Sequence, residues 1–128
     1  MRLLLDTHAF LWWIVDDNRL SSKALQLISN GGNEVFFSTV SAWEIVVKTG
    51  LGRVELPEPV ERFLPAQLHA NGFQVLPIHL SHALGVGDLP EVHKDPFDRM
   101  LVSQAVIERM TIVSGDRQLH GYPVAIEW

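Results

Sequence analysis

The sequence predicts an α/β domain whose central, mostly parallel sheet is flanked by helices on both faces. Two observations lead to this prediction. Short apolar runs alternate with helical patterns along the chain, which is typical of parallel sheets. The first run, residues 3–5, is apolar without interruption, as in strands that are covered on both faces. We find no repeat and no linker, so the 128 residues are predicted to form a single domain over residues 1–128.

Five strands are predicted from the short apolar runs. A continuous run such as that of residues 35–37 is typical of a buried strand. Pro77 indicates where the third strand ends, because proline cannot donate to the sheet. In chain order, the strands are expected at residues 3–5, 35–37, 73–78, 111–113 and 124–126.

Four helices are predicted from capping residues and apolar spacing. Serine is a preferred N-cap, and it opens the first helix at Ser21 or Ser22 and the second at Ser41, while glycines end both. The third helix has apolar residues at helical spacing. The fourth has Pro96 at its first position, where the missing N–H costs nothing. The first helix is expected to end near residue 30, and the second to cover residues 41–49. The third is expected from after Pro57 to about residue 71, and the fourth over residues 96–109.

Composition and charge limit the class of protein. Apolar residues make up 47% and charged residues 20%, which indicates a folded globular chain. There is no cysteine, so no disulfide or thiolate metal site is available, and a cytoplasmic location is expected. No apolar run is long enough to cross a membrane. The net charge of −5 is unusual for a nucleic-acid binder. Either nucleic acid is not the partner, or bound cations and a second chain supply positive charge.

Four acidic residues lie where strands are predicted to end or helices to start: Asp6, Glu44, Asp98 and Asp116. Asp6 follows the first strand and Asp116 the fourth, while Glu44 and Asp98 are expected in first helical turns. Ligands of open α/β sheets bind at the carboxyl ends of the strands. Carboxylate oxygens favour Mg²⁺ or Mn²⁺, ions that clamp a phosphodiester and activate water. One interpretation is therefore a metal site formed by these four acids.

Local structure offers a second interpretation for three of the acids. Glu44 matches the last position of a capping box that begins at Ser41. Asp98 suits the helix dipole as a first-turn acid, and Asp116 is a common turn residue. Asp6 ends an apolar strand and has no such local reason. Spacing alone leaves a metal site and structural acids both open.

Other polar residues near these acids also have local structural interpretations. Asp95 precedes a proline and is predicted to be the N-cap of the last helix. Lys48 lies one turn after Glu44, where an ion pair forms. Arg99 and Arg117 each follow a candidate acid, and they either contact phosphate or are solvated.

Histidine and tryptophan residues suggest two further sites. His79 and His82 have the spacing of zinc ligands, but a third ligand is not evident, so zinc is not favoured. Trp12 and Trp13 lie in an apolar run that cannot be buried on every face of a helix. Neighbouring loops cover them, or one ring lies at an interface with a second copy or another protein chain.

Five motifs, in a fixed order, span nearly the whole chain. They are Leu4-Leu5-Asp6-Thr7-His8; Ser41-Ala42-Trp43-Glu44-Ile45 with Lys48; Leu51-Gly52-Arg53 with Leu56-Pro57; residues 93–105, with Asp95-Pro96-Phe97-Asp98-Arg99 and Gln104-Ala105; and Val113-Ser114-Gly115-Asp116. Together they resemble the PIN-domain ribonucleases, specifically the VapC-type toxins of bacterial toxin–antitoxin pairs. Ser114 stands where the family more often has threonine, and the hydroxyl is retained.

The resemblance implies an endoribonuclease that depends on Mg²⁺ or Mn²⁺ and cuts tRNA or ribosomal RNA. The implied catalytic and metal-binding acids match Asp6, Glu44, Asp98 and Asp116. Thr7 and Ser114 are expected to hydrogen-bond and orient these acids. The resemblance also implies a homodimer and a VapB-type antitoxin that inhibits the enzyme. One metal ion and two remain open.

Three alternatives compete with the ribonuclease. A metallophosphoesterase is suggested by Asp6-Thr7-His8, but its later histidine motifs are missing. A receiver domain shares the fold class, but it needs adjacent acids after the first strand. A catalytically silent PIN-like binding module would be expected to lose at least one of the four acids, and all four are present.

Overall fold

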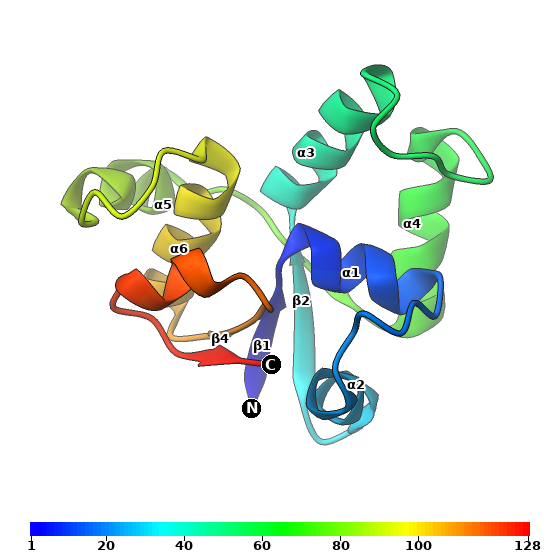
Figure 1. Cartoon of the computed structure of the whole chain (residues 1–128), viewed down its shortest axis with the longest axis horizontal. Helices are drawn as coiled ribbons and strands as arrows, with labels where there is room; N and C mark the ends of the chain where they lie inside the picture. Colours follow the sequence, from blue (N-terminus) through cyan, green and yellow to red (C-terminus); the bar gives the residue numbers. More distant parts are fainter.

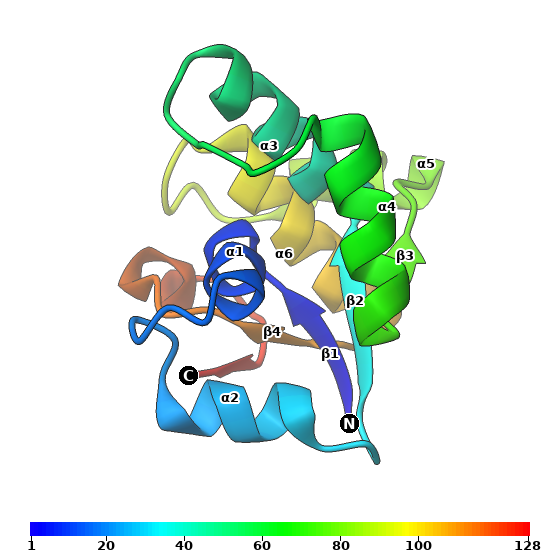
Figure 2. The ribbon, with the colours of Figure 1, turned by 90° about the vertical axis from the view of Figure 1, so that its right-hand side faces the viewer.

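The computed structural model describes residues 1–128 and contains a five-stranded sheet flanked by six α-helices (Figure 1 and Figure 2). The strand order is β3-β2-β1-β4-β5, and every pairing is parallel. The strands are β1 (Arg2–Leu5), β2 (Glu34–Ser38), β3 (Gln74–Leu76), β4 (Thr111–Val113) and β5 (Ile126–Glu127). The predicted fold class is confirmed, with β1 at the centre of the sheet.

The helices connect successive strands. They are α1 (Thr7–Ile14), α2 (Ser22–Ser29), α3 (Thr39–Gly50), α4 (Val60–Asn71), α5 (Leu80–Gly85) and α6 (Pro96–Glu108). Two short 3₁₀ helices, η1 (Val86–Asp88) and η2 (Arg117–Gly121), follow α5 and β4. None of these helices has the length and apolar character needed to span a membrane.

Side chains that accept backbone hydrogen bonds set several helix starts. Ser21 and Ser38 cap α2 and α3 in this way. The predicted N-cap Asp95 is confirmed at the start of α6, where its Oδ1 accepts from the N–H groups of Phe97 and Asp98 at 2.9 and 3.1 Å. Helix α4 ends at Gly72, whose φ of 66° lies in the left-handed region that glycine tolerates.

Several predicted boundaries were wrong. Helix α3 begins two residues before the predicted Ser41, because Ser38 is the residue that caps it. Strand β3 is shorter than its predicted range, and strand β5 begins two residues later than predicted. Helices α1 and α5 were not predicted. The apolar run in α1 covers every side of the helix, so it shows no helical period.

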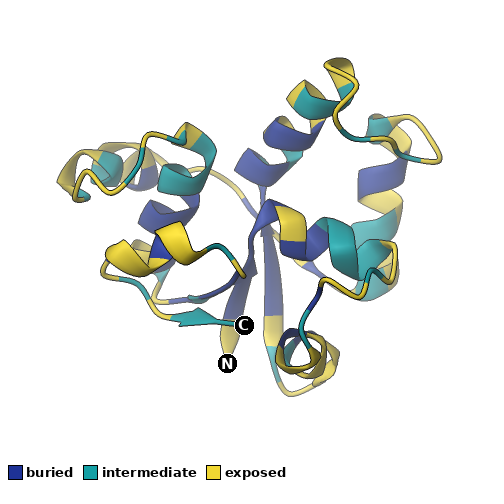
Figure 3. Ribbon diagram, in the orientation of Figure 1, coloured by how far each residue is buried: buried dark blue, intermediate teal, exposed yellow.

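Alternate side chains of β1 divide the core into two clusters, one on each face of the sheet. Leu3 and Leu5 pack with residues of α1, α2 and α4. Leu4 packs on the opposite side, mainly with residues of α6. All three leucines are fully buried, and Figure 3 shows the central strands β1 and β2 buried over most of their length. Each such side chain stabilises the fold by about 1.5–3 kcal/mol.

The carboxyl ends of β1, β2 and β4 lie side by side. Leu5 of β1 pairs with Phe37 of β2 and with Val113 of β4. Figure 2 shows β1 and β2 running together from the N-terminal end of the sheet into α1 and α3. The backbone N–H of Asp6 donates to the Val113 carbonyl at 3.2 Å, which extends the ladder by one residue. This edge of the sheet carries the candidate acids.

Candidate active site

Asp6 and Asp116 follow the neighbouring strands β1 and β4. Asp6 is 7% exposed, and its Oδ1 accepts a hydrogen bond from Ala9 N at 2.7 Å, which caps α1. The expectation that Asp6 has no local structural role was therefore wrong. Asp116 caps η2 by accepting from Gln118 N at 2.9 Å. The Ser114 hydroxyl lies near both acids, because it lowers the pKa of Asp6 and accepts a hydrogen bond from Asp116 N at 3.1 Å.

Glu44 belongs to α3 and is only 3% exposed. Thr7 Oγ1 lies 2.6 Å from Glu44 Oε1 and 2.9 Å from Ser41 Oγ, and Lys48 forms the predicted ion pair with Glu44 Oε2. Since α3 begins at Thr39, Glu44 lies in the second turn rather than the first. Ser41 is likewise inside the helix, so the capping-box interpretation was also wrong. Glu44 instead accepts a hydrogen bond from Thr7 of α1 and pairs with Lys48, one turn later in α3.

Asp98 lies in the first turn of α6, as predicted, and is oriented by a chain of hydrogen bonds. His93 Nε2 is 3.3 Å from Asp98 Oδ2, and His93 Nδ1 is 2.6 Å from the Tyr122 hydroxyl. Arg99 donates to that hydroxyl at 3.1 Å. Because the carboxylate can only accept, the His93 Nε2 carries the proton and its Nδ1 accepts from Tyr122. Each donor in the chain therefore points toward Asp98.

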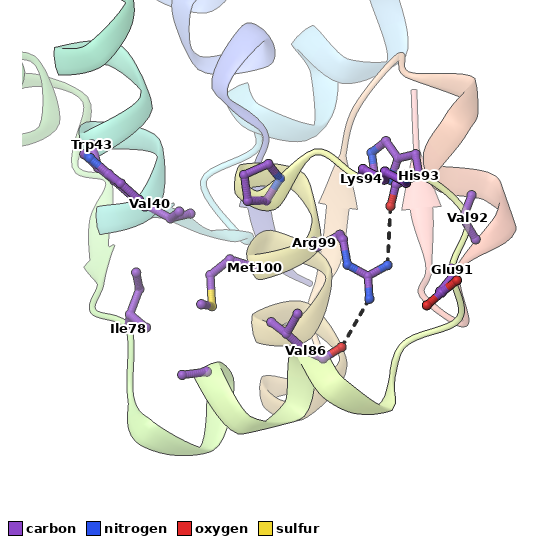
Figure 4. Close-up of a pocket in the computed structure, with 12 residues that line it drawn as sticks. Val40, Trp43, Ile78, Val86, Glu91, Val92, His93, Lys94, Arg99 and Met100 are labelled. Atoms are coloured by element: carbon purple, nitrogen blue, oxygen red, sulfur yellow. Dashed lines mark hydrogen bonds between the residues drawn. The ribbon is translucent and has the colours of Figure 1, made fainter.

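Arg99 also fastens the loop that precedes α6. Its guanidinium donates to the carbonyl oxygens of Val86 at 3.3 Å and Pro90 at 2.9 Å, with a longer contact of 3.5 Å to His93 (Figure 4). It borders a pocket of about 800 Å³, lined also by Trp43 on α3, that contains none of the four candidate acids. These hydrogen bonds differ from the solvated side chain that was one interpretation of Arg99, and its contact with phosphate stays a prediction.

His82 is fully buried and has no free ring nitrogen for zinc. Its Nδ1 accepts from His79 N at 3.0 Å, and its Nε2 lies 3.0 Å from Glu108 Oε1. The pair His79 and His82 therefore forms a turn of α5 that is joined to α6, in agreement with the choice not to favour zinc.

Mutual repulsion connects the four acids electrostatically. Burial raises the pKa of Asp98 from 3.8 to about 6, and the carboxylates of Asp95, Glu44 and Asp6 add to this increase. Burial also raises the pKa of Asp6, and repulsion from Asp116 contributes in the same direction. Asp6 and Asp116 also line one pocket, and Thr7, next to Asp6, hydrogen-bonds Glu44.

The chemistry of these acids fits a divalent cation. In this structure, no three Asp, Glu or His side chains are close enough to hold one ion in common. The donors are nevertheless all carboxylate oxygens, which Mg²⁺ and Mn²⁺ prefer, and a cation would relieve the repulsion that raises two of their pKa values. Among Lys and Arg residues, Lys48 alone forms an ion pair with one of the four.

The parallel sheet with acids at its carboxyl edge defines a known class of protein. Residues 3–124 match the family model of the PIN domain, and the chain belongs to the PIN domain family. It is similar to ribonuclease VapC22 of Mycobacterium tuberculosis, to which it is 30% identical over 129 residues, covering 97% of each chain.

Solved structures share this fold. The chain superposes with a TM-score of 0.71 on a chain of VapBC2 from Rickettsia felis bound to a promoter DNA fragment, at 17% identity over 99% of this chain and 98% of that one. For DNA-bound VapBC from Salmonella typhimurium, the TM-score is 0.69 at 19% identity over 99% and 97% of the two chains. The resemblance to PIN domains of the VapC type is confirmed.

Proposed function

We propose that this chain is a metal-dependent endoribonuclease that acts as the toxin of a toxin–antitoxin pair. The observation that carries this proposal is the group of four electrostatically coupled carboxylates at the carboxyl edge of the sheet. Its similarity to ribonuclease VapC22 over nearly the whole chain supports the same activity.

The acids would hold Mg²⁺ or Mn²⁺: Asp6, Glu44, Asp98 and Asp116. When bound, such an ion stabilises charge on the phosphodiester and lowers the pKa of the attacking water. The chain's own residues orient the acids beforehand. Ser114 holds Asp6, Thr7 and Lys48 hold Glu44, and His93 holds Asp98. Hydrolysis by water at phosphorus would leave a 5′-phosphate and a 3′-hydroxyl.

The proposed substrate is tRNA or ribosomal RNA, and the proposed partners are a VapB-type antitoxin and a second copy of the chain, in the cytoplasm. The net charge of −5 supports a partner that supplies positive charge. An antitoxin arginine placed among the acids would neutralise them and inhibit the enzyme. Exposed apolar side chains of α3, including Trp43 and Val46, offer surface for a protein partner.

Cleavage of total RNA by purified, antitoxin-free protein tests this proposal. The assay compares Mg²⁺, Mn²⁺ and EDTA, beside the isosteric variant Asp98→Asn. We expect metal-dependent cleavage that Asp98→Asn lowers by more than about 100-fold, since lost outer partners of a metal site alone cost 10–100-fold. Equal cleavage by the variant would refute the role of Asp98.

Two alternatives give different results in the same assay. A catalytically silent PIN-like module would bind metal or RNA but cut none of the RNA tested. A metallophosphoesterase would hydrolyse small phosphoesters while leaving RNA intact. Sequencing the new 5′ ends would identify the cut site of an active ribonuclease.

A further inference from the structure

A pocket of about 460 Å³ opens beside Asp6 and Asp116. Its other lining residues include His8, Trp12 and Trp128. Two of the candidate acids thus share one cavity with three aromatic rings. Neither tryptophan has a place in the metal site described above.

The adjacent tryptophans of α1 have different surroundings. Trp13 Nε1 donates to Asn71 Oδ1 at 2.9 Å, and its ring packs 6.1 Å from that of Phe73, so this side chain is part of the fold. Trp12 also packs against the core but is only partly buried, and it lines the pocket beside Asp6 and Asp116. Trp12 therefore offers an aromatic surface to the pocket.

Trp128 lies against the backbone next to Asp116. A Cβ atom on Gly115 would be 2.6 Å from the Trp128 ring, so only glycine permits this contact. The rings of Trp12 and Trp128 are 5.8 Å apart at their centroids and inclined by 56°. His8 adds a third ring 5.7 Å from Trp12. The rings form a small aromatic cluster at the acidic edge.

The cation Arg19 lines the same pocket as the aromatic rings and the two acids. The Arg19 guanidinium is 5.0 Å from the centroid of the Trp12 ring, and its side chain is 67% exposed. A neighbouring pocket of about 300 Å³ shares His8, Trp12 and Arg19, and adds Lys48 and Arg53. Arg19 is paired with Asp17 and Lys48 with Glu44, whereas Arg53 forms no ion pair.

Aromatic rings with flanking cations are the means by which proteins bind unpaired nucleotides: bases stack on the rings and phosphates contact the cations. We propose that Trp12 and Trp128 form a stacking site for an unpaired base of the RNA substrate, next to the phosphodiester held by the acids. This inference rests on the proposed function. Charged side chains interrupt the apolar surface of the pocket, which favours a nucleotide over an apolar protein segment.

The stacking site predicts which RNA is cut. A base within a duplex is stacked on its neighbours and cannot enter the pocket, whereas a base in a loop can. The site therefore selects unpaired nucleotides of a structured RNA without reading their sequence, since every base has an aromatic face.

Fluorescence anisotropy with short RNA oligonucleotides tests the proposal. The full chain carries Asp98→Asn to prevent cleavage, alone or with Trp12→Leu or Trp12→Phe. We expect Trp12→Leu to weaken single-strand binding about tenfold, while Trp12→Phe keeps it within about threefold because phenylalanine still stacks. Binding of a fully paired RNA should change by less than about twofold. Unchanged single-strand binding, or an equal loss for duplex RNA, would overturn the proposal.

A second measurement uses the unaltered chain, in case Trp12→Leu destabilises α1. Single-stranded RNA that contains 4-thiouridine is crosslinked to the protein by light, and the modified peptides are identified by mass spectrometry. Crosslinks at Trp12 or Trp128 are expected. Crosslinks confined to other surfaces would overturn the stacking site.

Failure of this inference differs from failure of the proposed function. If the parent cuts RNA and Trp12→Leu leaves its KM unchanged, the stacking site is wrong while the ribonuclease stands. If Trp12→Leu weakens single-strand binding but the parent cuts no RNA, the stacking site stands and the ribonuclease fails. If Trp12→Leu weakens only binding of the cognate antitoxin, the cluster is a protein interface and the proposal is overturned.

Discussion

Helix α6 carries two polar clusters that differ in how their charges and hydrogen bonds are satisfied. Toward its C-terminus, Gln104 Oε1 accepts from Ser38 Oγ at 2.6 Å, and Glu108 lies 3.0 Å from His82 Nε2. At its N-terminus, Asp98 has a 3.3 Å contact with His93 and repulsion from nearby carboxylates that helps to raise its pKa to about 6.

This difference separates a cluster that stabilises the fold from a cluster that is proposed to bind a metal ion. In the cluster around Gln104, protein groups meet one another's hydrogen-bonding needs, and no buried side-chain nitrogen or oxygen in the chain lacks a partner. Such a network stabilises the fold and needs no ligand. The acidic edge also has its hydrogen bonds, but it keeps negative charge that its neighbours do not neutralise. Under the proposed function, a divalent cation from outside the chain would neutralise this charge.

The largest expected effect on stability follows from breaking the satisfied network. Gln104→Leu leaves Ser38 Oγ without its acceptor in a fully buried position. We expect the free energy of unfolding in urea to fall by about 2–3 kcal/mol, the usual cost of an unsatisfied buried group. Gln26→Leu on the exposed face of α2 is the control, with a change below about 0.5 kcal/mol. RNA cleavage by folded Gln104→Leu should be normal. A loss of cleavage would show that the two clusters are not independent.

A smaller effect is expected from the residue that orients Asp98. His93→Ala removes the hydrogen bond to the Asp98 carboxylate and should weaken Mn²⁺ binding about tenfold, as lost outer partners of metal ligands do. His93→Gln, which keeps a donor, should recover part of this affinity. Tyr122→Phe should cost less, because it removes the hydroxyl that contacts His93 and Arg99 but leaves the bond between His93 and Asp98. Titration calorimetry measures all three, and parent-like affinity in His93→Ala would show that the chain of hydrogen bonds is not used.

The smallest effect concerns pH and the metal-free protein. A carboxyl whose pKa is raised on folding favours the folded state below its unfolded pKa, near 4, and this stability is lost as pH rises through the folded pKa of about 6 for Asp98. The free energy of unfolding should therefore fall between pH 5 and pH 7.5, by on the order of 1 kcal/mol after allowance for solvent screening.

Asp98→Asn is the matched control for this pH dependence. The variant has no carboxyl to ionise at this position, so its stability should change less over the same pH range. Saturating Mn²⁺ should also reduce the change in the parent. An identical pH dependence in parent and variant would show that Asp98 does not ionise near pH 6.

Much of the fold follows from local signals. The apolar run at residues 3–5 identifies the central strand, and Asp95 with Pro96 identifies the start of α6, because capping and proline chemistry act over a few residues. The start of α3 does not follow from such local signals. Ser38 and Ser41 are equally good caps by sequence, and only the pairing of β2 with its neighbours decides where the strand ends.

The four candidate acids can be chosen from the sequence, whereas the groups that contact them cannot. Parallel topology explains why residues after β1, β2 and β4 meet at one edge. The contact of His93 with Tyr122 spans 29 residues of sequence and has no local signal. The difference between Trp12 and Trp13 likewise depends on Asn71, which lies 58 residues from Trp13 and belongs to another helix.

The most direct test of the account is the uptake of Mn²⁺ by the metal-free protein at neutral pH, followed by titration calorimetry. It compares the parent with two isosteric variants of α6, Asp98→Asn in the acidic edge and Glu108→Gln in the satisfied network. The account predicts that the parent and Glu108→Gln bind Mn²⁺ equally well and that Asp98→Asn loses this binding. Equal binding by all three proteins, or none by the parent, would contradict it.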